Sequence, residues 1–294
     1  MSVPLILSGK DVSQFIYEGL KDRIASLNSQ NTVPGLAAVL VGDDPASQVY
    51  VRSKTKIFNS LSMHTETFRL SSEISEGDLL ELIGRLNVDS SFHGILVQLP
   101  LPKHINSQHI LRTIRPDKDV DGFHPENAGL LSLGEPRFIP CTPKGIMKIL
   151  DYYDIDLKGK HVVVVGRSNI VGRPISILAS LKQDGANGTT TLCHSATPDI
   201  EHYTQSADVV IVALGVPHFL IASMIKEGAV VVDVGINRID ADTKKGYQLV
   251  GDAHWDEIIT KVSAATPVPG GVGPMTIAML VENTVEAAEG SVSG

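Results

Sequence analysis

Short apolar runs that end in glycine, proline or acidic residues restrict this chain to a layered α/β fold. Examples are "GLAAVLVGDDP" (35–45), "HVVVVG" (161–166) and "GAVVVDVG" (228–235). Each run has the length of a strand and is too short to cross a bilayer. Helix-like segments separate the runs, and an alternating order of strand and helix predicts parallel sheets with helices on their faces.

The order of these segments predicts two α/β domains within the 294 residues. Residues 35–102 follow a β-α-β-α-β pattern, in which the helix at 46–61 lies between the first two strands. A second α/β unit begins after a helix predicted at 142–155, with Thr142 as its N-cap and Pro143 at its first position. The segment 103–142 is predicted to be mainly irregular. We therefore divide the chain into domains 1–143 and 144–273.

Composition excludes several classes of protein. The net charge of −8 argues against binding to nucleic acid or to an anionic membrane. The only cysteines are Cys141 and Cys193, and neither a C-x-x-C pair nor H-E-x-x-H is present, so we expect no disulfide scaffold and no metal site. The N-terminus lacks the pattern of a signal peptide or presequence, which predicts a cytoplasmic protein.

The stretch "VVVVGRSNIVGRP" (162–174) is typical of a strand, a tight turn and a helix start. Gly166 permits the turn, Gly172 allows the helix to approach the strand, and Pro174 suits a first helical turn. The backbone N–H groups at such a helix start suit a pyrophosphate. Because the pattern is not G-x-G-x-x-G, a plain strand–turn–helix without a ligand remains the alternative.

The next strand, "TTTLC", supplies the second indication of a nucleotide site. It ends in His194, Ser195, Ala196 and Thr197, where a site that prefers NAD carries an acidic residue for the ribose. Arg167 directly follows Gly166. A cation and hydroxyl groups in place of the carboxylate favour a 2′-phosphate, and hence NADP. Arg167 could instead be a loop residue that faces solvent.

The helix at 46–61 contains a lysine that differs from its charged neighbours. With Tyr50 at zero on a helical wheel, Lys54 falls at about 40°, on the apolar face of the helix, while Arg52 and Lys56 fall on the opposite side. Lys54 could extend its stem over apolar surface. Alternatively, burial could lower the pKa of its amine and make the group useful for proton transfer.

Several motifs together resemble one enzyme family over almost the whole chain, the bifunctional methylenetetrahydrofolate dehydrogenase/methenyltetrahydrofolate cyclohydrolase family. The motifs that carry the resemblance are "YVRSKTK", "GILVQLPLP", "PDKDVDGFHPENAG", "PCTPKGI", "GRSNIVGRP", "CHSAT" and "TPVPGGVGPMT". The resemblance implies oxidation of 5,10-methylenetetrahydrofolate to the methenyl compound with NADP, followed by hydrolysis to 10-formyltetrahydrofolate. It also implies a cleft between the two domains, a final helix (274–290) that returns to the first domain, and a homodimer.

The resemblance assigns roles to individual residues. Lys54 looks like the acid–base group, Tyr50 like the residue that stacks on the folate, Gln98 like the partner of Lys54, and Asp121 like the carboxylate that binds the pterin. By their residue types alone, Gln98 could be an ordinary amide at a strand end and Asp121 part of an Asp-Gly turn. The remaining contacts implied are Pro269, Gly270 and Gly271 for substrate, and Gly166, Arg167, Ser168, Gly172, His194, Ser195 and Ile236 for the cofactor.

The sequence departs from the family pattern at Ala196, where a basic residue is common, so NADP preference depends on Arg167 and Ser195. The loop 265–276 could by its composition be a linker between domains. Two other functions remain open: a monofunctional methylenetetrahydrofolate dehydrogenase, and a non-catalytic NADP-binding regulatory protein.

Overall fold

The computed structural model describes residues 3–243 and 246–293, which form two compact units. Residues 1–15 and 142–276 make up unit 1, and residues 16–141 and 277–294 make up unit 2. Sequence analysis placed all of 1–143 in one domain, whereas the first 15 residues here group with unit 1. The divisions fall inside helices α1 (Gly9–Ser29) and α10 (Val272–Ser293) and after the first residue of α6 (Cys141–Tyr152).

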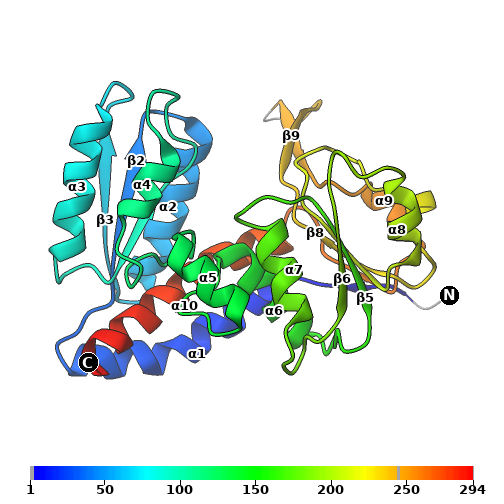
Figure 1. Cartoon of the computed structure of the whole chain (residues 1–294), viewed down its shortest axis with the longest axis horizontal. Helices are drawn as coiled ribbons and strands as arrows, with labels where there is room; N and C mark the ends of the chain where they lie inside the picture. Colours follow the sequence, from blue (N-terminus) through cyan, green and yellow to red (C-terminus); the bar gives the residue numbers. More distant parts are fainter. Residues whose placement is uncertain (1–2, 244–245, 294) are drawn as a thin grey trace. The chain divides into compact units, whose positions relative to one another are not determined.

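Unit 2 contains a parallel sheet of three strands in the order β3-β2-β4 (Figure 1). The strands are β2 (Gly35–Val41), β3 (His64–Leu70) and β4 (Gly94–Val97). Helices α2 (Pro45–Ser60) and α3 (Glu76–Val88) connect them, which confirms the predicted β-α-β-α-β order. Asp44 caps α2 by accepting a hydrogen bond from the Ser47 amide, and Ser75 caps α3 through the Asp78 amide.

The two faces of β2 pack against different helices, because successive side chains of a strand point to opposite faces. Every residue of β2 is buried. Ala37, Val39 and Val41 join a cluster with the apolar faces of α3 and α4 (Ser107–Thr113). Helix α2 contacts β2 and β3 and buries Phe58 completely.

Unit 1 contains a parallel sheet of six strands in the order β1-β11-β8-β7-β5-β6. The strands are β1 (Leu5–Ile6), β5 (His161–Val165), β6 (Thr189–Cys193), β7 (Val209–Val212), β8 (Val230–Asp233) and β11 (Ala264–Ala265). Starting at β5, the chain adds β6 on one side and β7 and β8 on the other. The order therefore reverses between β5 and β7, as in doubly wound sheets.

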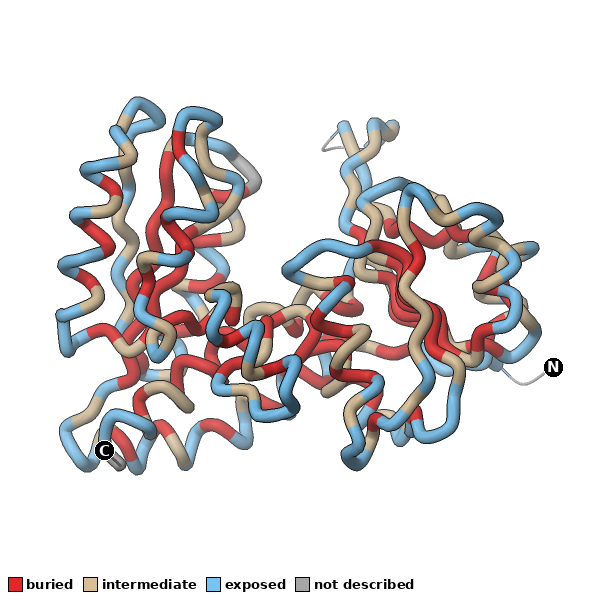
Figure 2. Tube along the Cα trace, viewed as in Figure 1, coloured by how far each residue is buried: buried red, intermediate tan, exposed pale blue. Residues whose placement is uncertain are grey.

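Helices cover the sheet of unit 1, whose central strands are buried (Figure 2). One apolar cluster joins alternate residues of β5, β7 and β8 to residues of α8 (Ile200–Ser206) and α9 (Trp255–Ile258). Helix α7 (Gly172–Ser180) lies against β5 and β6. The near-continuous valine of these strands fits a sheet that is covered on both faces.

The structure contains several elements that sequence analysis missed. Two short helices, α4 and α5 (Pro125–Leu133), lie in the segment predicted to be irregular. A short 3-10 helix, η1 (Ala222–Met224), precedes β8. A hairpin of β9 (Asn237–Asp240) and β10 (Tyr247–Val250) follows β8. Strand β1 pairs with β11 at the sheet edge.

The predicted start of the helix after residue 140 was wrong by a short distance. Helix α6 spans Cys141–Tyr152, so Thr142 lies inside its first turn and is not the N-cap. Pro143 is tolerated there because the amides of the first turn have no partner within a helix. Among the described helices, none combines the length and apolar character needed to cross a membrane.

We expect the packing of α2 to depend on Phe58, which is completely buried in unit 2. Phe58→Ala should lower the free energy of unfolding by about 3–5 kcal/mol, because it removes a large apolar side chain and leaves a cavity. Phe15, which is 65% exposed, provides the matched control: Phe15→Ala should have a much smaller effect. Equal losses for the two variants in denaturant titrations followed by circular dichroism would contradict this account.

Candidate active site

Helix α2 presents two of the predicted site residues one turn apart. Tyr50 is half-buried and Lys54 is only 4% exposed, whereas Arg52 and Lys56 on the same helix are exposed. This difference agrees with the helical wheel. The i, i+4 spacing places the ammonium group of Lys54 over the Tyr50 ring, 4.3 Å from its centroid.

The end of strand β4 provides a polar partner for Lys54. Lys54 Nζ donates a hydrogen bond to Gln98 Oε1 at 3.3 Å. The other end of the Gln98 amide donates to the Leu99 carbonyl at 2.9 Å, which turns the amide oxygen toward the lysine. Gln98 is thus more than a solvent-exposed amide at a strand end, since its two polar atoms have separate partners.

Burial shifts the pKa of Lys54 and that of Asp121 in opposite directions. Removal of water lowers the pKa of Lys54, and the negative charges of Asp121 and the Cys141 thiolate form partly oppose this shift. Burial also raises the pKa of Asp121, against the stabilising charge of Lys54 and a hydrogen bond from Cys141. Both shifts favour neutral groups, so the amine can accept a proton more readily at neutral pH than an exposed lysine can.

The backbone around Asp121 is held by residues that sequence analysis did not identify. The Cys141 thiol donates to Asp121 Oδ1 at 3.6 Å and to the Val120 carbonyl at 3.5 Å. Asn283, in α10, donates to the Val120 and Ile139 carbonyls. Gly122 has a φ of +73°, and a side chain there would meet Pro140. The "DG" pattern does form a turn, but Asp121 at that turn also faces the Lys54 charge.

Asp119 fixes the same loop from inside the protein. Its side chain is 1% exposed, and its Oδ2 accepts hydrogen bonds from the His124 amide at 2.7 Å and from Asn127 Nδ2 at 2.8 Å. Asn127 also donates to the Pro116 carbonyl. The sequence offers only one signal for this role, which is a second aspartate two residues before Asp121.

In unit 1, the turn between β5 and α7 brings backbone segments into close contact. Gly166 has a φ of +122°, and a Cβ there would collide with the Ala213 carbonyl. A Cβ on Gly172 would collide with the carbonyl of Gly166. Ser168 Oγ accepts hydrogen bonds from the amides of Val171, the N-cap residue, and Gly172, so this hydroxyl satisfies two amides at the helix start.

The other residues predicted to bind cofactor follow β6 and β8, which are separated in the sheet by β5 and β7. His194 and Ser195 follow β6, and Ile236, which is 60% exposed, follows β8. His194 accepts from the Ala196 amide and Thr197 accepts from the His194 amide, so the turn is closed by its own side chains. Arg167 and Ser195 are exposed. These residues share the carboxyl edge of the sheet, where ligands of doubly wound folds bind.

The predicted substrate loop precedes α10. The Gly270 carbonyl accepts from the Lys10 amide at 3.2 Å, and the Gly271 amide donates to the Pro267 carbonyl at 2.8 Å. Gly270 has a φ of +109°, and a Cβ on Gly271 would crowd Thr266 and Pro267. Both glycines are therefore required by the backbone itself, whether or not the loop contacts a ligand. Pro269 lies between Pro267 and Gly271, which this last hydrogen bond joins.

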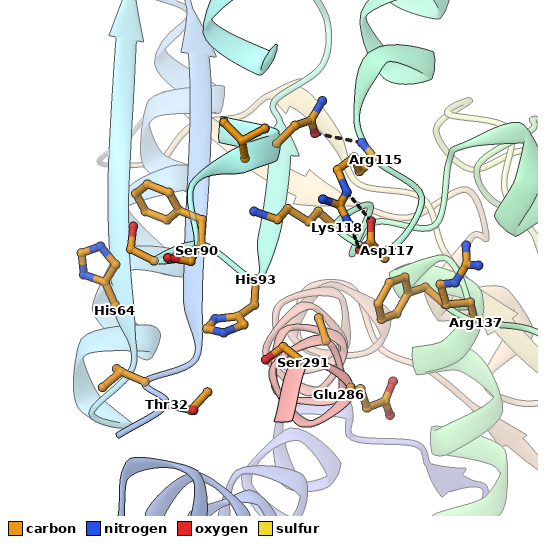
Figure 3. Close-up of a pocket in the computed structure, with 18 of the residues that line it drawn as sticks. Thr32, His64, Ser90, His93, Arg115, Asp117, Lys118, Arg137, Glu286 and Ser291 are labelled. Carbon is orange, nitrogen blue, oxygen red and sulfur yellow. Dashed lines mark hydrogen bonds and ion pairs between the residues drawn. The ribbon is translucent and has the colours of Figure 1, made fainter. Parts of the chain in front are cut away.

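A large cavity of roughly 1010 Å³ lies elsewhere in unit 2, at the amino ends of its strands (Figure 3). Several of its polar side chains are engaged with protein groups: His93 Nδ1 accepts from the Gly35 amide, Lys118 donates to two carbonyls, and Arg115 pairs with Asp117. Burial, with the nearby Lys118 charge, lowers the pKa of His93. Because Gln98 follows the opposite end of β4, this cavity is separate from the Lys54 group.

Comparisons with known proteins point to one family over nearly the whole chain. The family description "Tetrahydrofolate dehydrogenase/cyclohydrolase, catalytic domain" matches residues 7–121, and "Tetrahydrofolate dehydrogenase/cyclohydrolase, NAD(P)-binding domain" matches residues 140–292. The bifunctional protein FolD of Chloroherpeton thalassium is 52% identical over 97% of this chain and 98% of its own length. This chain belongs to the tetrahydrofolate dehydrogenase/cyclohydrolase family.

Solved structures of the tetrahydrofolate dehydrogenase/cyclohydrolase family share the fold. The bifunctional FolD dehydrogenase/cyclohydrolase of Campylobacter jejuni is 49% identical, with a TM-score of 0.92 over 97% of this chain and 99% of that one. The Trypanosoma brucei dehydrogenase-cyclohydrolase, complexed with NADP and an inhibitor, is 35% identical, with a TM-score of 0.94 and full coverage of both chains. The two-domain α/β fold predicted from sequence is thereby confirmed.

The buried Asp119 gives a prediction about pH and stability. Burial raises the pKa of Asp119 to about 7, against hydrogen bonds from His124 and Asn127, while an aspartate of an unfolded chain titrates near roughly 3.9. Between these values the folded state holds one proton more than the unfolded state. The contribution of Asp119 to stability is therefore complete below the lower value and falls by about 1.4 kcal/mol per pH unit through the window.

Asp119→Asn removes this titration and keeps an oxygen that can accept from the same donors. The free energy of unfolding of the wild type, minus that of the variant, should decrease from about pH 5 to about pH 7. A difference that stays constant across the window, measured by denaturant titration at each pH, would show that Asp119 is ionised in the folded protein throughout.

Proposed function

We propose that this chain oxidises 5,10-methylenetetrahydrofolate with NADP and hydrolyses the resulting methenyl compound to 10-formyltetrahydrofolate. In the first reaction, a hydride leaves the methylene carbon for the nicotinamide and a methenyl cation remains. In the second, water adds to that carbon and one of the two bonds from carbon to folate nitrogen breaks, with net release of one proton. Family membership supports both reactions.

The observation that carries the proposal is the buried amine of Lys54 between Gln98 and Tyr50. Attack of water on the methenyl carbon requires a group that accepts a proton. A lysine whose pKa is lowered by burial suits this task, and Gln98 orients the amine through a neutral oxygen that adds no charge to raise its pKa. Lys54 then returns the proton as the carbon–nitrogen bond breaks.

The roles of Tyr50 and Asp121 follow from their chemistry. The aromatic face of Tyr50 can stack on a flat part of the folate while the ring remains next to Lys54. The pterin edge carries N–H groups side by side, and the ionised carboxylate of Asp121 can accept them as a pair. These hydrogen bonds and the charge of Lys54 favour the ionised form against the burial that raises the pKa of Asp121. We propose that the loop formed by Pro269, Gly270 and Gly271 contacts the substrate, with Pro269 as its exposed residue.

We assign NADP to unit 1 because its β6 turn lacks an acidic side chain. Arg167 and Ser195 are exposed at the carboxyl edge of the sheet and can bind a 2′-phosphate. Gly166, Ser168 and Gly172 shape the helix start that faces the pyrophosphate, and we place His194 and Ile236 beside the nucleotide. The trypanosomal relative named above was solved with NADP. A cytoplasmic homodimer completes the proposal, and sedimentation velocity tests its oligomeric state.

Two assays on the purified protein test the proposed function. Addition of methylenetetrahydrofolate should cause reduction of NADP, and addition of methenyltetrahydrofolate alone should accelerate loss of its near-ultraviolet absorbance over that in buffer. Activity in the first assay only would establish a monofunctional dehydrogenase. Nucleotide binding without activity in either assay would indicate the non-catalytic alternative.

Replacement of the lysine separates the two activities. Lys54→Met keeps the apolar stem but removes the proton acceptor, so the cyclohydrolase rate should fall by about 10²–10⁴-fold while a measurable dehydrogenase rate and the fold remain. Lys56→Met is the matched control, because Lys56 is exposed on the same helix and should leave both rates near those of the wild type. Full cyclohydrolase activity in Lys54→Met would show that the side chain only covers apolar surface.

Replacement of Arg167 tests the choice of nucleotide. Arg167→Ala should raise the KM for NADP by about 10–100-fold, the value of a lost charge-assisted hydrogen bond, while the KM for NAD changes little. Arg173, also exposed and two residues into α7, provides a control cation. If Arg167→Ala weakens NADP and NAD equally, then Arg167 does not recognise the 2′-phosphate.

A further inference from the structure

The carboxyl edge of the sheet in unit 1 contains a buried network that the predicted nucleotide contacts do not explain. The strand order reverses between β5 and β7, and ligands bind beyond the strand ends at such a point. The loops that leave β7 and β8 next to this point begin at Ala213 and Val234. Both loops are held by aspartate side chains from inside the unit.

Asp252 connects the two loops to each other. Its side chain is fully buried, and its Oδ2 accepts hydrogen bonds from the amides of Leu214 at 2.6 Å and Gly215 at 2.9 Å, in the loop after β7. Its Oδ1 accepts from Asn237 Nδ2 at 2.8 Å, at the start of β9. A single carboxylate thus spans the loop after β7 and the loop after β8.

Asp233 holds Asp252 in place. It is 4% exposed, and it accepts from the amides of Gly235 and Asp252 through Oδ1 and from the amide of Ala253 through Oδ2, each at 2.9 Å. The carboxyl groups lie directly against the backbone: a Cβ on Gly235 would collide with Asp252, and one on Gly251 would collide with Asp233. The surrounding sequence therefore has glycine where these side chains need room.

The network holds an apolar side chain in an exposed position. Ile236 lies between Gly235, bonded to Asp233, and Asn237, bonded to Asp252, and it remains 60% exposed. Burial of two carboxyl groups is costly, and a well-packed apolar core would stabilise the unit as well. An apolar core would not fix the geometry of backbone amides in two separate loops, whereas the buried carboxyl groups do.

We propose that Asp252 is a positioning residue for the nicotinamide nucleotide. It does not touch the nucleotide; it sets the Leu214–Gly215 turn and the Ile236 side chain as two walls of the nucleotide site, with Asp233 as its support. This inference depends on the proposed function for the identity of the ligand.

The experiment measures the dissociation constant for NADP by calorimetry, together with steady-state kinetics of both reactions. Asp252→Ala leaves the Leu214 and Gly215 amides without their acceptor and should weaken NADP binding by about 10-fold or more. Asp252→Asn keeps an oxygen for these amides, and the Asn237 amide can turn to accept from the new NH₂ group. The NADP affinity of Asp252→Asn should therefore lie between that of Asp252→Ala and that of the wild type. Asn237→Ala breaks only the contact to the loop after β8, and its NADP affinity should also be intermediate.

The cyclohydrolase reaction, assayed without nucleotide, is the internal control. A positioning role predicts that Asp252→Ala raises the KM for NADP and leaves the cyclohydrolase rate and the KM for folate close to those of the wild type. A merely structural role predicts that the fraction of active enzyme falls, so that both rates drop in proportion while the KM for NADP stays constant. Asp256→Ala, at an exposed acidic residue of α9, controls for loss of charge.

Unchanged NADP affinity in the three variants at Asp252 and Asn237 would overturn the proposal. If Asp252→Ala does not fold, the NADP affinities of Asp252→Asn and Asn237→Ala, compared with that of the wild type, decide whether Asp252 positions the site. If the wild type lacks both activities, the proposed function fails, but the calorimetric comparison still tests whether Asp252 positions the site for NADP.

Discussion

Desolvation of one ammonium group is the interaction on which the proposed chemistry depends. Lys54 is buried on α2, and loss of water lowers its pKa more than the charge of Asp121 raises it. The position is tolerable because Gln98 accepts a hydrogen bond and the Tyr50 ring lies beneath the charge. The parallel sheet of unit 2 makes this possible, since α2 and the end of β4 both lie next to β2.

Buried carboxyl groups shape the loops in both units. Asp119 fixes the loop that presents Asp121, and Asp252 with Asp233 fixes the loops at the carboxyl edge of the larger sheet. In each case the carboxyl oxygens accept hydrogen bonds from backbone amides that have no partner within a strand or helix. A loop that must keep one shape needs such partners, because irregular backbone leaves some of its polar groups without a backbone partner.

Strong local signals made much of this structure predictable. The valine runs, the glycines after them and the spacing of Tyr50 and Lys54 gave the parallel sheets, the β5–α7 turn and the burial of the lysine. The resemblance named the family, which the comparisons confirm. Helices α4 and α5 were missed because they are short and begin in polar, proline-rich sequence. Strand β1 was missed because two exposed residues carry no strand pattern, and only its pairing with β11 defines it.

The sequence by itself determined the fold class, the family and the face of α2 on which Lys54 lies, because periodicity and contiguous motifs are local properties of the chain. The resemblance implied that Gln98 is the partner of Lys54, but only the tertiary structure decided which other distant side chains meet. The contacts of Cys141 with Asp121 and of Asp252 with Leu214 join residues that are far apart in sequence. Such contacts arise when strands and loops pack into three dimensions, and no local pattern of residues encodes their distance or their hydrogen-bond partners.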